Sequence, residues 1–135
     1  MMELVSSDHK KIVNIGTSDT WVSLISTIEI RLDYYKEEIP LAIEFLRSCT
    51  CSGENGYKIA RQINLIRDEL SKFKPDQIIY DASNLTKKAP WEGNISEVIT
   101  SCANFYTTAD GEDLLFELVK ILCYAQIKKV NIQLP

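Results

Sequence analysis

The sequence predicts an α+β or α/β fold in a single domain, with a mixed sheet of about five strands covered by three to four helices. Two observations support this prediction. Stretches with apolar residues at three- and four-residue steps, typical of amphipathic helices, interleave with short β-branched runs, typical of strands. No internal repeat or Gly/Ser-rich linker interrupts the chain. Of its 135 residues, 45% are hydrophobic and 25% are charged, so one domain over residues 1–135 can bury a core without disulfides or metals.

The N-terminal part is expected to form two strands and a long helix. Residues 2–6 and 11–15 are rich in apolar and β-branched side chains, which favour strands. A polar cluster then breaks the run, and Ser18 or Asp19 is positioned to cap a helix over residues 20–35. Six apolar residues recur along one face of this helix: Trp21, Leu24, Ile25, Ile28, Leu32 and Tyr35.

Two further helices are expected in the middle of the chain. Pro40 disfavours a helical conformation at the residue before it and suits the first turn of a new helix over residues 40–47. After a turn, a longer helix over residues 55–73 is expected to end before Pro75. Its buried face is expected to carry Ile59, Ile63, Ile66, Leu70 and Phe73.

The remainder is expected to contain three strands, an irregular stretch and one helix. Short apolar runs at residues 77–81 and 102–108 are predicted to be strands. Asp110 is positioned to cap the last helix, with Glu112 and Asp113 in its first turn, where carboxylates oppose the positive helix end. A final strand is predicted where apolar and polar residues alternate: Val130, Asn131, Ile132, Gln133 and Leu134.

The charge balance argues against a protein that binds nucleic acid. The chain has 15 basic and 19 acidic residues, so its net charge of −4 has the wrong sign for displacing counterions from a phosphate backbone. Its N-terminus lacks the basic start and apolar run of a signal peptide, and no apolar stretch approaches the ~20 residues of a membrane-spanning helix. We therefore expect a cytoplasmic protein whose partner is neither nucleic acid nor a membrane.

Residue types that commonly carry chemistry are sparse. His9 is the single histidine, and it lies between the first two predicted strands beside two lysines. A zinc site would need a second close pair of ligands besides Cys49 and Cys51, and a disulfide framework would need an oxidising compartment. Cys102 and Cys123 lie among apolar neighbours and are expected to be buried thiols. We therefore predict no catalytic, cofactor-binding or metal-binding residues and no enzymatic activity.

The negative charge is concentrated in about one third of the chain. Between Asp81 and Glu117 there are seven acidic residues and two lysines, a net charge of −5, whereas the remainder is close to neutral. This segment also contains Trp91 in an irregular stretch, and tryptophan is a typical interface anchor. The alternatives are that Trp91 folds inward over the core and that the acidic excess only confers solubility. Six residues are predicted to bind a protein partner: Trp91, Glu92, Asp81, Asp110, Glu112 and Asp113.

Two motifs in this segment carry a family resemblance. The first is Pro-Trp-Glu-Gly-Asn-Ile-Ser at residues 90–96, and the second is Asn-Phe-Tyr-Thr-Thr-Ala-Asp-Gly-Glu-Asp-Leu at residues 104–114. Shorter matches follow the same order, at residues 26–28, 65–70, 78–81 and 99–101. Together they resemble the Immunity protein 70 family of bacterial polymorphic toxin systems over most of the chain. The sequence departs from the family pattern at Ala89, where a second proline is usual, and at Glu92, where a glycine is usual.

The resemblance implies an antitoxin of the kind found in contact-dependent growth inhibition and related systems. Its implied partner is a cognate toxin C-terminal domain, which it binds and blocks stoichiometrically. Delivered toxins include nucleases, which need cationic surfaces to hold nucleic acid. An acidic inhibitor suits such a surface, because complementary charge raises the association rate.

Two alternatives to an immunity protein are compatible with the sequence. The first is a small non-enzymatic adaptor or regulatory protein of the same fold class with a different protein partner. The second is a hydrolase in which Asp81, Asp110 and Asp113 hold a divalent metal through oxygen ligands. A toxin gene directly upstream of the reading frame would favour an immunity protein over an adaptor.

Overall fold

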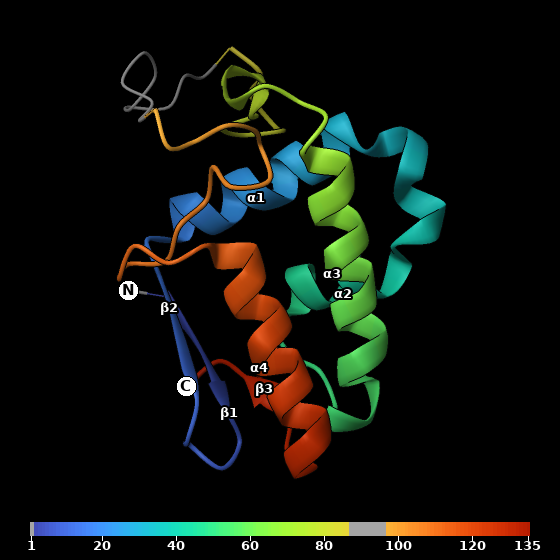
Figure 1. Ribbon diagram of the computed structural model, residues 1–135, viewed down its shortest axis with the longest axis vertical. Helices are drawn as coiled ribbons and strands as arrows, with labels where there is room; N and C mark the ends of the chain where they lie inside the picture. The colour runs from blue at the N-terminus through green and yellow to red at the C-terminus, as the bar shows by residue number, and fades with distance from the viewer. Residues whose placement is uncertain (1, 87–96) are drawn as a thin grey trace.

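A small antiparallel sheet joins the N-terminal and C-terminal parts of the chain. Strand β1 (Met2–Ser6) pairs with β2 (Ile12–Gly16) on one side and with the short strand β3 (Ile132–Gln133) on the other, in the order β2-β1-β3. The computed structural model describes residues 2–86 and 97–135. Figure 1 shows the sheet beside the helical part of the molecule, with β1 and β2 nearly parallel to the long axis.

Helices form most of the described structure. The α-helices are α1 (Ser18–Arg31), α2 (Pro40–Ser48), α3 (Gly56–Leu70) and α4 (Leu114–Lys128), and the short 3-10 helices are η1 (Asp33–Glu38), η2 (Gly53–Asn55) and η3 (Pro75–Gln77). Helices α3 and α4 pack side by side and run in opposite directions, and α1 lies crosswise to them (Figure 1). Both α1 and α4 also contact β2, so the helices bury one side of the sheet.

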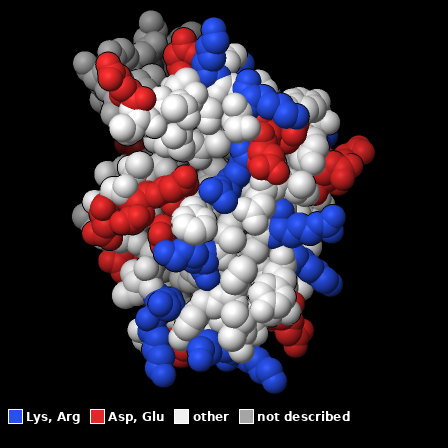
Figure 2. All heavy atoms as spheres, in the orientation of Figure 1, with Lys and Arg blue, Asp and Glu red and all other residues white. Residues whose placement is uncertain are grey.

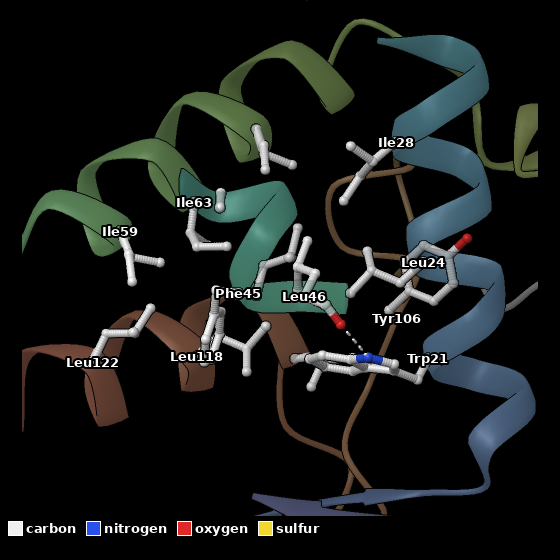
Figure 3. Close-up of a cluster of buried hydrophobic side chains, with 14 of the residues drawn as sticks. Trp21, Leu24, Ile28, Phe45, Leu46, Ile59, Ile63, Tyr106, Leu118 and Leu122 are labelled. Atoms are coloured by element: carbon white, nitrogen blue, oxygen red, sulfur yellow. Dashed lines mark hydrogen bonds between the residues drawn. The ribbon is translucent and has the colours of Figure 1, made fainter. Parts of the chain in front are cut away.

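The apolar periodicity predicted the core correctly. On α3, Ile59, Ile63, Ile66 and Leu70 are all buried, as their spacing along one face predicted. Figure 3 shows two of them, Ile59 and Ile63, facing Leu118 and Leu122 of α4 in the buried cluster. Phe73, the last member of the predicted stripe, lies beyond the helix end and is only partly buried.

A buried tryptophan connects α1 to α2. Trp21 packs in the core with Leu24 and Ile28, and its indole N–H donates to the carbonyl oxygen of Leu46 at 2.8 Å (Figure 3). Leu46 lies in the last turn of α2, where carbonyls lack partners within the helix. The indole therefore satisfies both its own polar atom and a free helix-end carbonyl inside the core.

Two glycines let the start of α3 approach α4 closely. A Cβ atom on Gly56 would lie 2.2 Å from the carbonyl oxygen of Leu122, and one on Gly53 would lie 2.3 Å from that of Val130. Such distances are far below van der Waals contact, so any larger residue would push the two segments apart.

The predicted class is compatible with the structure, but the prediction of about five strands is wrong. Three strands are present in the described residues, and all of their pairings are antiparallel. Residues 77–81 form no strand, because side chains of α1 rather than a neighbouring strand bind their backbone. Residues 102–105 form a turn, and Thr107 makes only an isolated antiparallel bridge with Asp113 of the same loop, so residues 102–108 form no strand.

Two helix starts also differ from the prediction. Thr17, rather than Ser18 or Asp19, is the N-cap of α1, and it makes no side-chain capping bond. Asp113, rather than Asp110, is the N-cap of α4. The predicted helix over residues 20–35 is divided, because α1 ends at Arg31 and the chain continues as η1.

All four cysteines are free thiols. Cys102 is buried, as predicted, whereas Cys123 is only partly buried. Cys49 is buried at the end of α2, and Cys51 is partly buried. Burial raises the pKa of Cys51 and of Cys102 to about 11, so both are protonated thiols near neutral pH.

Candidate functional site

Three of the predicted contact residues lie in the loop that leads into α4, residues 107–113, here called the acidic loop. Its backbone is closed by two hydrogen bonds: Thr108 N donates to Glu112 O at 2.8 Å, and Gly111 N donates to Thr108 O at 3.0 Å. Gly111 has a φ of 84°, a conformation that glycine adopts without a steric penalty. The Thr108 hydroxyl accepts from the amides of Asp110 and Glu112, at 3.3 and 3.1 Å.

The acidic loop is fixed to the rest of the fold at both ends. The amide of Ala109 donates to the carbonyl oxygen of Asn14 on β2 at 2.8 Å. The carboxylate of Asp113 accepts from the amide of Phe116 at 3.2 Å and so caps α4. The loop is therefore held between the sheet and a helix end.

This arrangement presents negative charge on an ordered backbone. Asp110 and Glu112 are exposed, and Asp113 is half-buried at the helix cap. In Figure 2, acidic side chains gather along the left edge, over the loop that leads into α4, while basic side chains gather at the lower end. The amides of Thr108, Asp110, Gly111 and Glu112 bond within the loop and that of Ala109 bonds to β2, so the exposed carboxylates of Asp110 and Glu112 are the charged groups that the loop presents to a partner.

Asp81 belongs to a different segment, residues 77–82, here called the tethered segment, which runs along α1. The guanidinium of Arg31 donates to the carbonyl oxygen of Gln77 at 2.7 Å. Further along, the Thr27 hydroxyl accepts from the amide of Ile79 at 2.8 Å. Polar side chains of α1 thus take the place that a neighbouring strand would have in binding this backbone.

The tethered segment ends in a turn at Asp81. The Ser26 hydroxyl of α1 accepts from the amide of Ala82 at 3.0 Å. The Asp81 carboxylate accepts from the amide and the hydroxyl of Ser83, at 2.9 and 2.6 Å. This is an Asx turn, so the first role that the structure assigns to Asp81 is local.

A buried tyrosine connects the acidic loop with the tethered segment. The Tyr106 hydroxyl lies 2.7 Å from the hydroxyl of Thr27 and 2.9 Å from that of Ser23. Both α1 hydroxyls also donate to the carbonyl oxygen of Ile79, at 3.2 and 2.8 Å. Burial raises the pKa of Tyr106, so the phenol is neutral at physiological pH and remains able to donate.

One acidic residue near these segments was missed by the sequence analysis. Asp19, at the start of α1, accepts a hydrogen bond from the Tyr80 hydroxyl at 3.2 Å. Desolvation and the Asp19 carboxylate raise the pKa of Tyr80. Asp19 lies 62 residues before Asp81 in the chain, so only the folded structure brings it near the tethered segment.

An exposed aromatic residue was also missed. Phe116, in the first turn of α4, is 46% exposed. The buried residues of α4 recur at three- and four-residue steps, and Phe116 lies off that stripe, so the spacing itself marks it as an exposed position. The buried residues are Leu114, Leu115, Leu118, Ile121, Leu122 and Ala125.

The structure therefore places the six predicted contact residues unequally. It brings Asp110, Glu112 and Asp113 together in the acidic loop and places Asp81 on the tethered segment. Trp91 and Glu92 lie outside the described residues.

Neither a metal-binding group nor a membrane-spanning helix is found in the parts of the chain that the structure describes. Across residues 2–86 and 97–135, no three His, Cys, Asp or Glu side chains are placed to hold a metal ion together. The carboxylates of Asp81, Asp110 and Asp113 thus do not form the site that a metal-dependent hydrolase would need. Within the same residues, no helix has the length and apolar character needed to cross a membrane.

Comparison with known families agrees with the motifs described above. The family model described as Immunity protein 70 matches residues 6–134, nearly the whole chain. Searches of curated proteins and of solved structures found no significant match. The match includes both the acidic loop and the tethered segment. The protein therefore belongs to the Immunity protein 70 family, and this membership suggests a toxin-neutralising role.

Proposed function

We propose that this protein is a cytoplasmic immunity protein that binds one cognate toxin C-terminal domain and neutralises it by stoichiometric inhibition, without catalysis. Membership of the Immunity protein 70 family is the observation that carries this proposal. The partner is the toxic domain of a bacterial polymorphic or contact-dependent toxin, encoded directly upstream of this protein.

The acidic loop is the part of the surface best suited to meet such a partner. Its exposed carboxylates, on Asp110 and Glu112, project from a backbone that is hydrogen-bonded internally and to β2. A rigid negative surface suits a toxin whose active site must bind a phosphate backbone, because that site is cationic. Charge complementarity of this kind accelerates association more than it strengthens the final complex.

The first experiment is co-expression with the C-terminal domain encoded immediately upstream. The proposal predicts that cells producing the domain grow only when this protein is also produced, and that the two proteins co-purify in a 1:1 ratio. Persistent toxicity with no complex would contradict the immunity function and favour an adaptor with a different partner.

A charge-neutral variant tests the acidic loop separately. Asp110→Asn, Glu112→Gln and Asp113→Asn together remove three negative charges, and asparagine at position 113 keeps the helix cap. We expect the association rate to fall by about tenfold at low salt and to lose most of its salt dependence.

The matched control removes the same number of charges from exposed residues of η1: Asp33→Asn, Glu37→Gln and Glu38→Gln. This helix lies on the other side of the molecule from the acidic loop in Figure 1, so its variant should associate nearly as fast as the wild type. Equal rates for both variants would exclude the acidic loop as the contact and leave the immunity function standing.

A further inference from the structure

An exposed aromatic side chain adjoins the acidic loop. Phe116 lies one turn after the Asp113 cap, and its amide donates to the Asp113 carboxylate at 3.2 Å. The residue is 46% exposed even though it belongs to the helix that forms much of the core. Aromatic residues are enriched at protein interfaces, where they supply a large contact area with few rotatable bonds.

Two cations hold the Phe116 ring in place. The guanidinium of Arg67 on α3 lies 5.4 Å from the ring centroid, and the ammonium of Lys120 on α4 lies 5.5 Å from it. Each cation is positioned in turn by a neighbour: Arg67 donates to the Asn64 side chain at 3.1 Å, and Lys120 pairs with Glu117 at 3.0 Å. The ring is therefore oriented before any partner arrives, so that binding costs less side-chain entropy.

We infer that Phe116 is the apolar anchor of the toxin-binding surface, and this inference rests on the proposed function. The complementary surface on the toxin domain is an apolar pocket with lysine or arginine side chains on the rim that faces the acidic loop. On the opposite rim, a carboxylate of the toxin meets Arg67 and Lys120. Opposite charges on the two sides of one aromatic residue fix the orientation in which the partner docks.

Position distinguishes Phe116 from the other exposed apolar residue near the end of the same helix. Ile127 is more exposed, at 62%, but it lies eleven residues later in α4, or about 16 Å along the helix axis. It is followed by Lys128 and Lys129, at the end where basic side chains gather in Figure 2. The same truncation at Ile127 removes exposed apolar surface far from the acidic loop, which makes it the matched control.

The test measures binding kinetics with the C-terminal domain encoded immediately upstream, in an inactivated form that cells tolerate alone. Association and dissociation rates are recorded for the wild type, Phe116→Ala and Ile127→Ala. For Phe116→Ala we expect dissociation about 30-fold faster, the effect of losing an interface anchor, with little change in the association rate. Ile127→Ala should dissociate like the wild type.

Phe116→Gln provides a second variant that keeps side-chain length and helix propensity while removing the apolar ring. Thermal unfolding of each variant shows that it is folded before its binding is measured. If the wild type binds and both Phe116 variants dissociate like Ile127→Ala, the inference is wrong and the immunity function stands. If the wild type does not bind the domain at all, the proposed function and the inference both fail.

Discussion

The hydroxyls of Tyr106 and Thr27 lie 2.7 Å apart in the protein interior, 79 residues apart in sequence. This contact joins the chain segment before the acidic loop to the face of α1 that carries the tethered segment. Thr27 also binds both the amide and the carbonyl of Ile79, so one threonine serves two segments. A buried polar cluster thus connects the residue that precedes the acidic loop with the tethered segment.

Removing the Tyr106 hydroxyl tests how much this cluster contributes to stability. Tyr106→Phe keeps the buried ring but leaves the hydroxyls of Ser23 and Thr27 with one partner fewer. We expect the free energy of unfolding to fall by about 1–2 kcal/mol, as measured by urea denaturation. The control is Tyr57→Phe, at an exposed ring, which should change the stability by less than about 0.5 kcal/mol. If Tyr106→Phe lowers the free energy of unfolding no more than Tyr57→Phe does, the hydroxyl of Tyr106 contributes no net stability.

The cap of α4 gives a prediction that separates hydrogen bonding from charge. Asp113→Ala removes the acceptor for the Phe116 amide and should cost about 1 kcal/mol, whereas Asp113→Asn keeps an acceptor and should cost little. Urea denaturation of both variants provides the measurement. Similar losses in the two variants would indicate that Asp113 acts through its charge at the positive helix end rather than through its hydrogen bond.

The sequence predicted those parts of the fold in which apolar periodicity and burial coincide. The stripe Ile59, Ile63, Ile66 and Leu70 on α3 lies in the core as expected, because a helix of this length must bury its only apolar face. The family resemblance was likewise confirmed over residues 6–134. Both results rest on the order and spacing of residues along the chain, which the sequence displays directly.

One failure occurs where polar side chains replace a strand as the hydrogen-bond partner of a backbone segment. Residues 78–80 have the composition of a strand, but the hydroxyls of Ser23 and Thr27 bind this backbone. No local pattern marks that role, since serine and threonine on a helix are more often solvated or bonded to their own helix. The grouping of Asp110 with Glu112 could be anticipated from sequence, because they are neighbours in the chain. The contact of Phe116 with Arg67 could not, because it depends on how α3 packs against α4.

The close approach of α3 to α4 predicts that Gly56 tolerates no side chain. Alanine is favoured over glycine inside a helix by about 1 kcal/mol, yet here its Cβ would lie 2.2 Å from a carbonyl oxygen of α4. We expect Gly56→Ala to lower the free energy of unfolding by about 1–3 kcal/mol, because the two helices must separate.

Gly111→Ala is the matched comparison for Gly56→Ala. No atom lies within 4 Å of a Cβ at Gly111, and the only penalty is the left-handed backbone at φ 84°, about 1–2 kcal/mol. Gly56→Ala therefore loses stability through a steric clash, whereas Gly111→Ala loses it through backbone conformation. A smaller residue at position 122 cannot relieve the clash at Gly56, because the new Cβ would meet the backbone carbonyl oxygen of that residue. A Gly56→Ala protein more stable than the wild type would contradict the close packing of α3 against α4.

The turn between β1 and β2 predicts an acid-sensitive contribution to stability. The Asp8 carboxylate accepts from the hydroxyls of Ser6 at 2.6 Å and of Tyr124 at 2.7 Å, and these bonds lower the pKa of Asp8 from 3.8 to about 2. A pKa lowered by folding means that the ionised carboxylate stabilises the native state above the unfolded-state pKa. That stabilisation is lost as the pH falls from about 4 towards about 2.

Asp8→Asn cannot ionise, so it should lower the melting temperature at neutral pH and converge on the wild type in acid. Differential scanning fluorimetry across this range provides the measurement, with Asp33→Asn on η1 as an exposed control. A melting-temperature difference between wild type and Asp8→Asn that stays constant down to about pH 2 would show that the Asp8 contacts do not depend on its charge.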